Sequence, residues 1–269
     1  MRRSLIAAML ASPWARTASA AAPQAEPRQH WRSRFEAGLA DWGRLEADWG
    51  HHNLALLDDA GVPGRVLRVH LQQGGIDPGT MHRRGLPRSG TGFKARLLAA
   101  GATQATLHYR VRFAAGFDFV RGGKLPGLFG GSGPSGGRIP TADEGFSLRL
   151  MWRERGQGEV YAYLPTSRGQ ATSLLPGSLR FVPGHWHQLS QVLRLNTPGR
   201  DDGTLQLWQD GREVGRAGGL RLRDGAALSI DGVFFDVFFG GNDDSWAPRA
   251  DTHIDFADVV LAAAAGAGP

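Results

Sequence analysis

Short apolar or alternating segments, separated by Gly, Pro and Asp at intervals of roughly 8–15 residues, run along the chain from Trp31 onward. Examples are RVLRVHL at 65–71, ATLHYRVRF at 105–113 and GVFFDVFFGG at 232–241. No long stretch has the apolar period of a helix, and the 39 glycines and 15 prolines suit a chain with many turns. The sequence therefore predicts an all-β fold, an antiparallel β-sandwich.

The N-terminal segment differs from the rest of the chain. Arg2 and Arg3 precede the apolar stretch SLIAAMLA, and ASA at 18–20 is a small-residue cleavage site. These features are typical of a signal peptide, so we expect a secreted or periplasmic protein. No other apolar run approaches about 18 residues, so we expect no membrane insertion. The expected division is a signal peptide over 1–20, a flexible lead-in over 21–30, a single β-sandwich domain over 31–262 and a loose tail over 263–269.

The charge of the chain bears on its partners. The formal net charge is +6 and the isoelectric point is about 10.6, so the surface attracts polyanions. No run of five or more basic residues is present, and we expect no nucleic-acid partner. The chain has no cysteine, which excludes disulfides, thiol nucleophiles and cysteine metal sites.

Two neighbouring strands predict a polar face. In GFSLRLMWR at 145–153 and EVYAYL at 159–164, side chains alternate between the two faces of a sheet. A hairpin centred on residue 155 places Arg149 opposite Tyr161 and Ser147 opposite Tyr163, with all four side chains on one face. The opposite face is apolar, as expected for the side that packs on the core.

A lysine lies in an unusual setting about twenty residues before this hairpin. The chain has only two lysines, Lys94 and Lys124, and Lys124 lies in GGKLPGLFGG at 122–131. Its glycines and Pro126 predict a loop that approaches a ligand closely and borders the polar face. The polar face itself is open to three interpretations: ordinary solvent-facing pairs, a sugar-binding platform, or a catalytic site.

The catalytic interpretation requires chemistry that uses cations and phenols. β-Elimination on a uronic acid fits, because a base removes the C5 proton, a cation stabilises the charge that develops on the carboxylate, and an acid protonates the leaving O4. Lowering the pKa of a tyrosine from near 10 to about 7 requires roughly 4 kcal/mol, much of which two nearby cations can supply. Lys124 and Arg149 are the candidate cations, and we expect the charged Lys124 to lie where the uronate carboxylate binds.

These residues resemble a known family. GGKLPGLFGG, GFSLRLMWR, GEVYAYLP and, more loosely, VFFDVFFGGNDDSWAP resemble polysaccharide lyase family 14, the alginate and glucuronan lyases. The resemblance implies a jelly roll of the concanavalin A type, no cofactor, and cleavage of an acidic polysaccharide by β-elimination that leaves unsaturated uronic-acid ends. The catalytic set that it implies is Lys124, Ser147, Arg149, Tyr161 and Tyr163. The residues leave open which tyrosine is the base and which is the acid, and we favour Tyr163 as the main proton-transfer residue.

Other functions are less well supported by the residues. No strand carries the two close carboxylates of a retaining glycosidase, and His185 and His187 lack a third metal ligand at a suggestive spacing, so we expect no metal. The main alternative is a non-catalytic sandwich that binds acidic glycans. We expect a monomer in which Arg138 and Arg153 bind substrate carboxylates. Further arginines that could line such a groove are Arg83, Arg84, Arg88 and Arg121.

Overall fold

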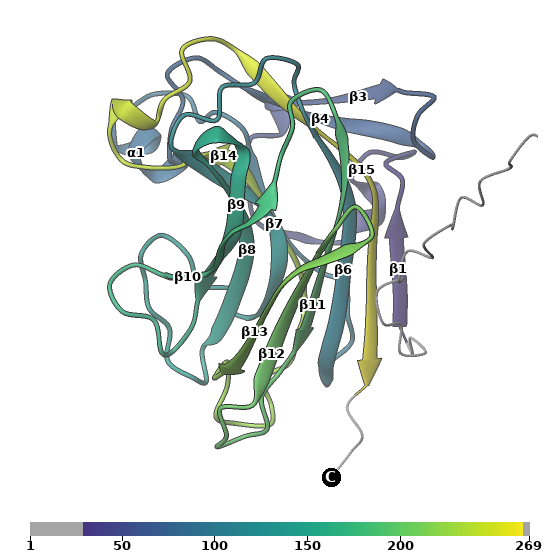
Figure 1. The fold of residues 1–269 in the computed structure, drawn as a ribbon, viewed down its shortest axis with the longest axis vertical. Coiled ribbons are helices and arrows are strands. Elements are labelled where there is room, and N and C mark those ends of the chain that lie inside the picture. The colour runs from purple at the N-terminus through teal and green to yellow at the C-terminus, as the bar shows by residue number, and fades with distance from the viewer. Residues whose placement is uncertain (1–28, 266–269) are drawn as a thin grey trace, which may run out of the picture.

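The computed structural model describes residues 29–265, which form two antiparallel sheets packed face to face (Figure 1). The first sheet contains β13 (Arg212–Leu220), β12 (Gly203–Gln209), β11 (Trp186–Arg194), β6 (Ala102–Phe113), β15 (Thr252–Ala265), β4 (Arg65–Leu71) and β3 (Leu54–Asp58) in that order, and β1 (Gln29–Ser33) pairs with β15. The predicted all-β sandwich is confirmed.

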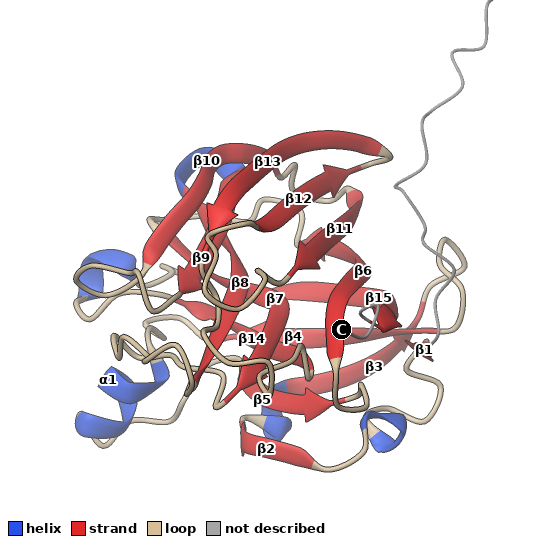
Figure 2. Ribbon diagram, turned by 90° about the horizontal axis from the view of Figure 1, so that it is seen from below, coloured by secondary structure: helices blue, strands red, loops and turns tan. Residues whose placement is uncertain are grey.

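The second sheet carries the segments that the sequence singled out. Its order is β10 (Thr172–Arg180), β9 (Gln157–Tyr163), β8 (Gly145–Arg153), β7 (Gly122–Gly131), β14 (Gly232–Phe239), β5 (Thr91–Arg96) and β2 (Leu45–Trp49). The helices are short and lie in the connections between strands (Figure 2): α1 (Pro78–Arg83) and four 3-10 turns, Ala40–Trp42, His51–Asn53, Glu154–Gly156 and Asp244–Trp246. None of the described helices is long and apolar enough to cross a membrane.

The core lies between the sheets and follows from alternation along the strands. In β8, Phe146, Leu148, Leu150 and Trp152 all point inward and are buried, as their parity predicts. Burying each such side chain stabilises the fold by about 1.5–3 kcal/mol. Every residue of β14 is buried, because this central strand packs on the core with one face and lies beneath side chains and loops on the other.

The glycine-rich segment around Lys124 is a strand rather than the predicted loop. β7 lies between β8 and β14, and its glycines serve close packing instead of a turn. A Cβ at Gly127 would lie 2.0 Å from the carbonyl oxygen of Leu148, so a larger residue would force the two strands apart. Pro126, which has no N–H for a ladder, lies where the register of β7 shifts against both neighbouring strands.

The first and last described strands lie close to the predicted domain limits. The predicted signal peptide lies outside the described residues, as does most of the lead-in. Strand β1 begins at Gln29, within the predicted lead-in, and Gln29 pairs with Ala263. At the other end, β15 continues to Ala265, within the predicted tail, and Ala265 pairs with Ala102 of β6. The backbone of this alanine-rich end is therefore hydrogen-bonded between two strands.

Candidate active site

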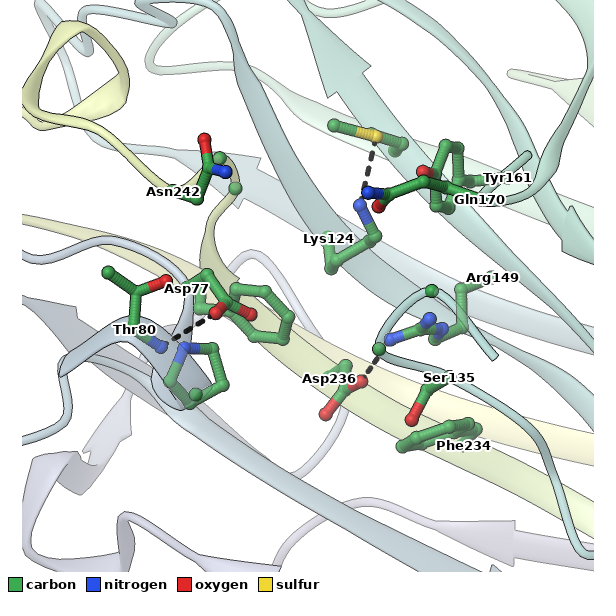
Figure 3. Close-up of a pocket in the computed structure, with 18 of the residues that line it drawn as sticks. Asp77, Thr80, Lys124, Ser135, Arg149, Tyr161, Gln170, Phe234, Asp236 and Asn242 are labelled. Carbon is green, nitrogen blue, oxygen red and sulfur yellow. Dashed lines mark hydrogen bonds and ion pairs between the residues drawn. The ribbon is translucent and has the colours of Figure 1, made fainter. Parts of the chain in front are cut away.

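A cavity of about 770 Å³ lies on the outer face of the second sheet, within the usual size range of ligand pockets. Its floor is formed by β5, β7, β8, β9 and β14, and its walls by β2, α1 and loops. Figure 3 shows residues that line it. The polar and aromatic side chains that line it include Trp49, Asp77, Thr80, Arg83, Arg88, Lys94, Lys124, Arg149, Arg153, Tyr161, Tyr163, Gln170, Asp236, Asn242 and Trp246, and Met151 lies among them.

Strand register brings the predicted residues to this face. Arg149 is opposite Tyr161 and Ser147 is opposite Tyr163, so the predicted hairpin register is confirmed. On the other side of β8, Met151 is opposite Lys124 of β7, which places the lysine on the same face of the sheet. Lysine, arginine and tyrosine side chains from three adjacent strands therefore converge on one cavity.

The Lys124 side chain is buried at the bottom of the cavity, with 7% of its surface exposed. Its Nζ donates to the Sδ of Met151 at 3.1 Å and lies 4.0 Å from the ring centre of Tyr161. Burial, with smaller contributions from the positive charges of Arg149 and Arg153, holds the pKa of Lys124 well below its ordinary value. A thioether is a weak acceptor that stabilises an ammonium little, so this environment favours the neutral amine.

Arg149 is also buried, with 2% of its side chain exposed, and it forms an ion pair with Asp236 of β14. Its guanidinium carbon lies 4.6 Å from the ring centre of Phe234 and 5.5 Å from that of Tyr163. Burial raises the pKa of Asp236, and the neighbouring Arg149 opposes this rise. Figure 3 shows Arg149 and Lys124 beside the same space, with Asp236 against the guanidinium.

The two tyrosines have different surroundings although their rings are in contact, with centres 5.7 Å apart. The Tyr163 side chain is buried, and its hydroxyl oxygen accepts a hydrogen bond from the backbone N–H of Gly137 at 2.9 Å. Tyr161 is half-buried and open to the cavity. Burial, followed by the nearby Tyr163, raises the pKa of Tyr161, so this phenol keeps its proton.

Two predicted residues do not reach the cavity. Ser147 is on the predicted face, but it is fully buried beneath the loop that follows β7, and its Oγ donates to the carbonyl oxygen of Pro134 at 2.6 Å. It therefore supports that loop and does not line the cavity. Arg138 is also outside the lining, because its exposed guanidinium turns toward Glu144 and forms an ion pair there.

Arg153 does line the cavity, and its guanidinium is held by Glu159 on the neighbouring strand, with Nε 2.8 Å from the carboxylate. Arg83 and Arg88 line the opposite wall, as the groove interpretation expects, and Arg88 lies 5.8 Å from the ring centre of Trp49. Within residues 29–265, no ion pair is found for either of these two arginines. They are the cations of the wall that remain available to a bound anion.

Several lining residues were not predicted from the sequence. Asp236 lies in the apolar run FFDVFF, where a single carboxylate among buried aromatics could have drawn attention to that face. Trp49 comes from a segment far from the hairpin, and Gln170 lies in the connection that follows it; neither has a local signal. Among residues 29–265, no group of three or more His, Asp or Glu side chains is placed to hold a metal ion.

The chain is similar to proteins of one known family. The sequence model of the family Polysaccharide lyase 14 matches residues 60–259, whereas no curated protein sequence matches the chain. The crystal structure of a marine PL-14 alginate lyase from Aplysia kurodai is similar, with 30% identity, a TM-score of 0.76, and coverage of 89% of this chain and 100% of that one.

Two other solved structures have a similar fold. A mutant of alginate lyase Aly36B in complex with alginate tetrasaccharide has 25% identity and a TM-score of 0.68, over 86% of this chain and 92% of that one. An endo-β-1,4-glucuronan lyase from the fungus Trichoderma reesei shares the fold at 10% identity and a TM-score of 0.59, over 88% and 96%. Because the family model spans well over half of the sequence, the chain belongs to polysaccharide lyase family 14.

Proposed function

We propose that this protein is a lyase that cleaves a polyuronate, with alginate as its first substrate, by β-elimination at Lys124 and Tyr161. The observation that carries the proposal is the buried Lys124 amine, held 4.0 Å from the Tyr161 ring in a cavity rich in arginine. Alginate is favoured over glucuronan because the two alginate lyases are 30% and 25% identical to this chain, and the glucuronan lyase is 10% identical.

Lys124 acts as the base. In its neutral form the amine has a free electron pair, and it takes the proton from C5 of the uronate, so the C5–H bond breaks and an N–H bond forms. The electron pair left at C5 spreads onto the adjacent carboxylate. This assignment replaces the cationic role that the sequence suggested for Lys124, because a desolvated lysine beside two arginines is a better base than a counter-ion.

Tyr161 acts as the acid. It keeps its proton in the free enzyme, lies in the open part of the cavity, and gives that proton to O4 as the C4–O4 bond breaks and the C4–C5 double bond forms. After this step Lys124 carries a proton that Tyr161 lacks, and proton exchange with solvent in the open cavity restores both groups after the product leaves. We prefer Tyr161 to Tyr163 because the hydroxyl of Tyr163 is engaged with Gly137 at the buried end of the pair.

The arginines supply the electrostatic part of the reaction. Arg149 and Arg153 approach the floor beside Lys124, where charge develops on the carboxylate, and Arg88 faces them from the opposite wall. Preorganised cations of this kind often supply the largest single contribution to catalysis. Because these side chains are held by strands and ion pairs, little reorganisation is needed when the charge appears.

The test is the formation of the double bond. The protein is incubated with alginate, polymannuronate, polyguluronate and glucuronan, and the ultraviolet absorbance of the unsaturated uronate is followed. We expect a rise on alginate that Tyr161→Phe lowers by about 10²–10⁴-fold. If the wild-type protein binds these polymers without any rise, the lyase proposal is wrong and the chain is a binding module for acidic glycans.

A further inference from the structure

Each arginine beside the Lys124 amine is paired with a buried carboxylate. Arg149 is paired with Asp236, and these side chains are 2% and 6% exposed. Arg153 is paired with Glu159, which is 5% exposed, while the arginine itself is 28% exposed. The Arg149 pair is therefore the one shielded from solvent, where the effect of a charge on its neighbours is strongest.

Asp236 also fixes the position of the guanidinium. Within residues 29–265, the only hydrogen bond that the structure gives this group goes from its Nη1 to Asp236, and its buried Nε has no hydrogen-bond partner. The aromatic rings of Phe234 and Tyr163 flank the guanidinium without bonding to it. Without the carboxylate, no polar group would hold Arg149 at its place on the floor of the cavity.

We propose that Asp236 is a positioning residue of this enzyme: it orients Arg149 toward the substrate carboxylate and offsets the charge that Arg149 places beside the Lys124 amine. The inference rests on the proposed function, in which Lys124 is the base. The Asp236 carboxylate allows the Arg149 cation to lie close to the carboxylate of the substrate. It also limits how far Arg149 disfavours protonation of the Lys124 amine, which must accept a proton in each turnover.

The charges around Lys124 determine the sign of the effect. From β8 it is faced by Arg149 and Arg153, from β9 by Glu159 and the phenol of Tyr161, and from β14 by Asp236. Positive neighbours favour the neutral amine, and the carboxylates of Glu159 and Asp236 favour the ammonium. Removing the charge of Asp236 must therefore lower the pH at which Lys124 loses its proton.

The composition of the chain permits a direct measurement. Because Lys94 and Lys124 are the only lysines, a protein labelled with ¹³C at lysine Cε gives two side-chain signals, which Lys124→Met assigns. In Asp236→Asn, we expect the Lys124 midpoint to fall by about half a pH unit or more. The acid limb of the kcat/KM profile on alginate should move in the same direction, and the maximum should fall by about tenfold or more, because Arg149 is no longer held.

Asp255→Asn is the matched control. Asp255 is 1% exposed and is paired with Arg68 and Arg112, but it lies in β15 of the first sheet, away from the cavity. This variant should lower the thermal midpoint and leave the Lys124 titration unchanged. If the midpoint of Lys124 is the same in wild type and Asp236→Asn, or moves upward, the proposal is overturned, even when Asp236→Asn loses activity.

Asp236→Glu separates the two parts of the role. It keeps the charge and displaces it by one methylene, so the Lys124 titration should match wild type while kcat/KM falls by about tenfold. This comparison remains decisive if Asp236→Asn does not fold, since unchanged kcat/KM in Asp236→Glu contradicts the positioning role. A wild type that forms no unsaturated product refutes the lyase proposal, whereas an active wild type with an unmoved titration refutes the role of Asp236 alone.

Discussion

Replacing Lys124 with methionine should abolish activity and stabilise the fold. The native protein holds this lysine as a buried amine whose pKa is well below its ordinary value, whereas the unfolded chain exposes it and protonates it near pH 10.4. Between the folded and the unfolded pKa, the unfolded state binds more protons, so the free energy of unfolding rises with pH by about 1.4 kcal/mol per unit. At neutral pH, Lys124 therefore destabilises the fold.

Methionine is unbranched and one heavy atom shorter than lysine, has no amine to desolvate, and should pack against Met151 and Tyr161, which lie next to the Lys124 amine. The variant should be more stable than wild type at pH 7, and this advantage should shrink by about 1.4 kcal/mol per unit as the pH rises from 8 to 10. All other titrating groups are shared by the two proteins and cancel in the difference. Loss of a general base should lower kcat by about 10²–10⁴-fold.

The assay is urea unfolding of both proteins at pH 7, 8, 9 and 10, combined with the rate of unsaturated uronate formation. A difference in unfolding free energy that stays flat with pH would mean that Lys124 keeps its proton in the folded protein. The amine could then not be the base, and the cationic role that the sequence suggested would return. A Lys124→Met variant with more than a tenth of wild-type activity would also show that Lys124 is not the base.

Three further substitutions test other parts of the site. Tyr161→Phe should lower kcat by about 10²–10⁴-fold. Tyr109→Phe, which removes a hydroxyl from the core, should leave kcat unchanged, and equal losses in the two variants would show that Tyr161 is not the acid. Ser147→Ala should cost about 1–3 kcal/mol of stability, measured by urea unfolding, and keep kcat/KM within about tenfold, because its Oγ bonds to a loop carbonyl. Gly127→Ala should lower the free energy of unfolding by about 1–3 kcal/mol or more, because the added Cβ would meet the backbone of Leu148. The thermal midpoint should fall by about 2–4 °C per kcal/mol, and an unchanged midpoint would contradict this packing.

The hairpin could be predicted because its information is local. Alternation fixed which side chains share a face, and the length of the connection fixed the register that sets Arg149 opposite Tyr161. Lys124 was assigned to the same region, but its segment was predicted as a loop, since glycine and proline are common in turns. Glycines that allow a neighbouring strand to approach closely look the same in sequence as glycines that bend the chain.

The rest of the site depends on contacts between distant segments. The pairing of Asp236 with Arg149 spans 87 residues, and neither local pattern points to the other. Ser147 was assigned to the correct face, but the connection between β7 and β8 folds over it, and only the tertiary structure shows this. Parity therefore predicts the face of a side chain, and not whether that side chain is covered.

The scarcity of lysine has a practical consequence for chemical labelling. Apart from the α-amino group, the chain offers amine-reactive reagents only Lys94, whose Nζ donates to the carbonyl oxygen of Ser132 at 2.5 Å, and Lys124, and both line the same cavity. A neutral buried amine is a good nucleophile. A small acylating reagent should therefore modify and inactivate the enzyme at the cavity, a bound oligouronate should protect it, and coupling to a support through surface amines should proceed poorly.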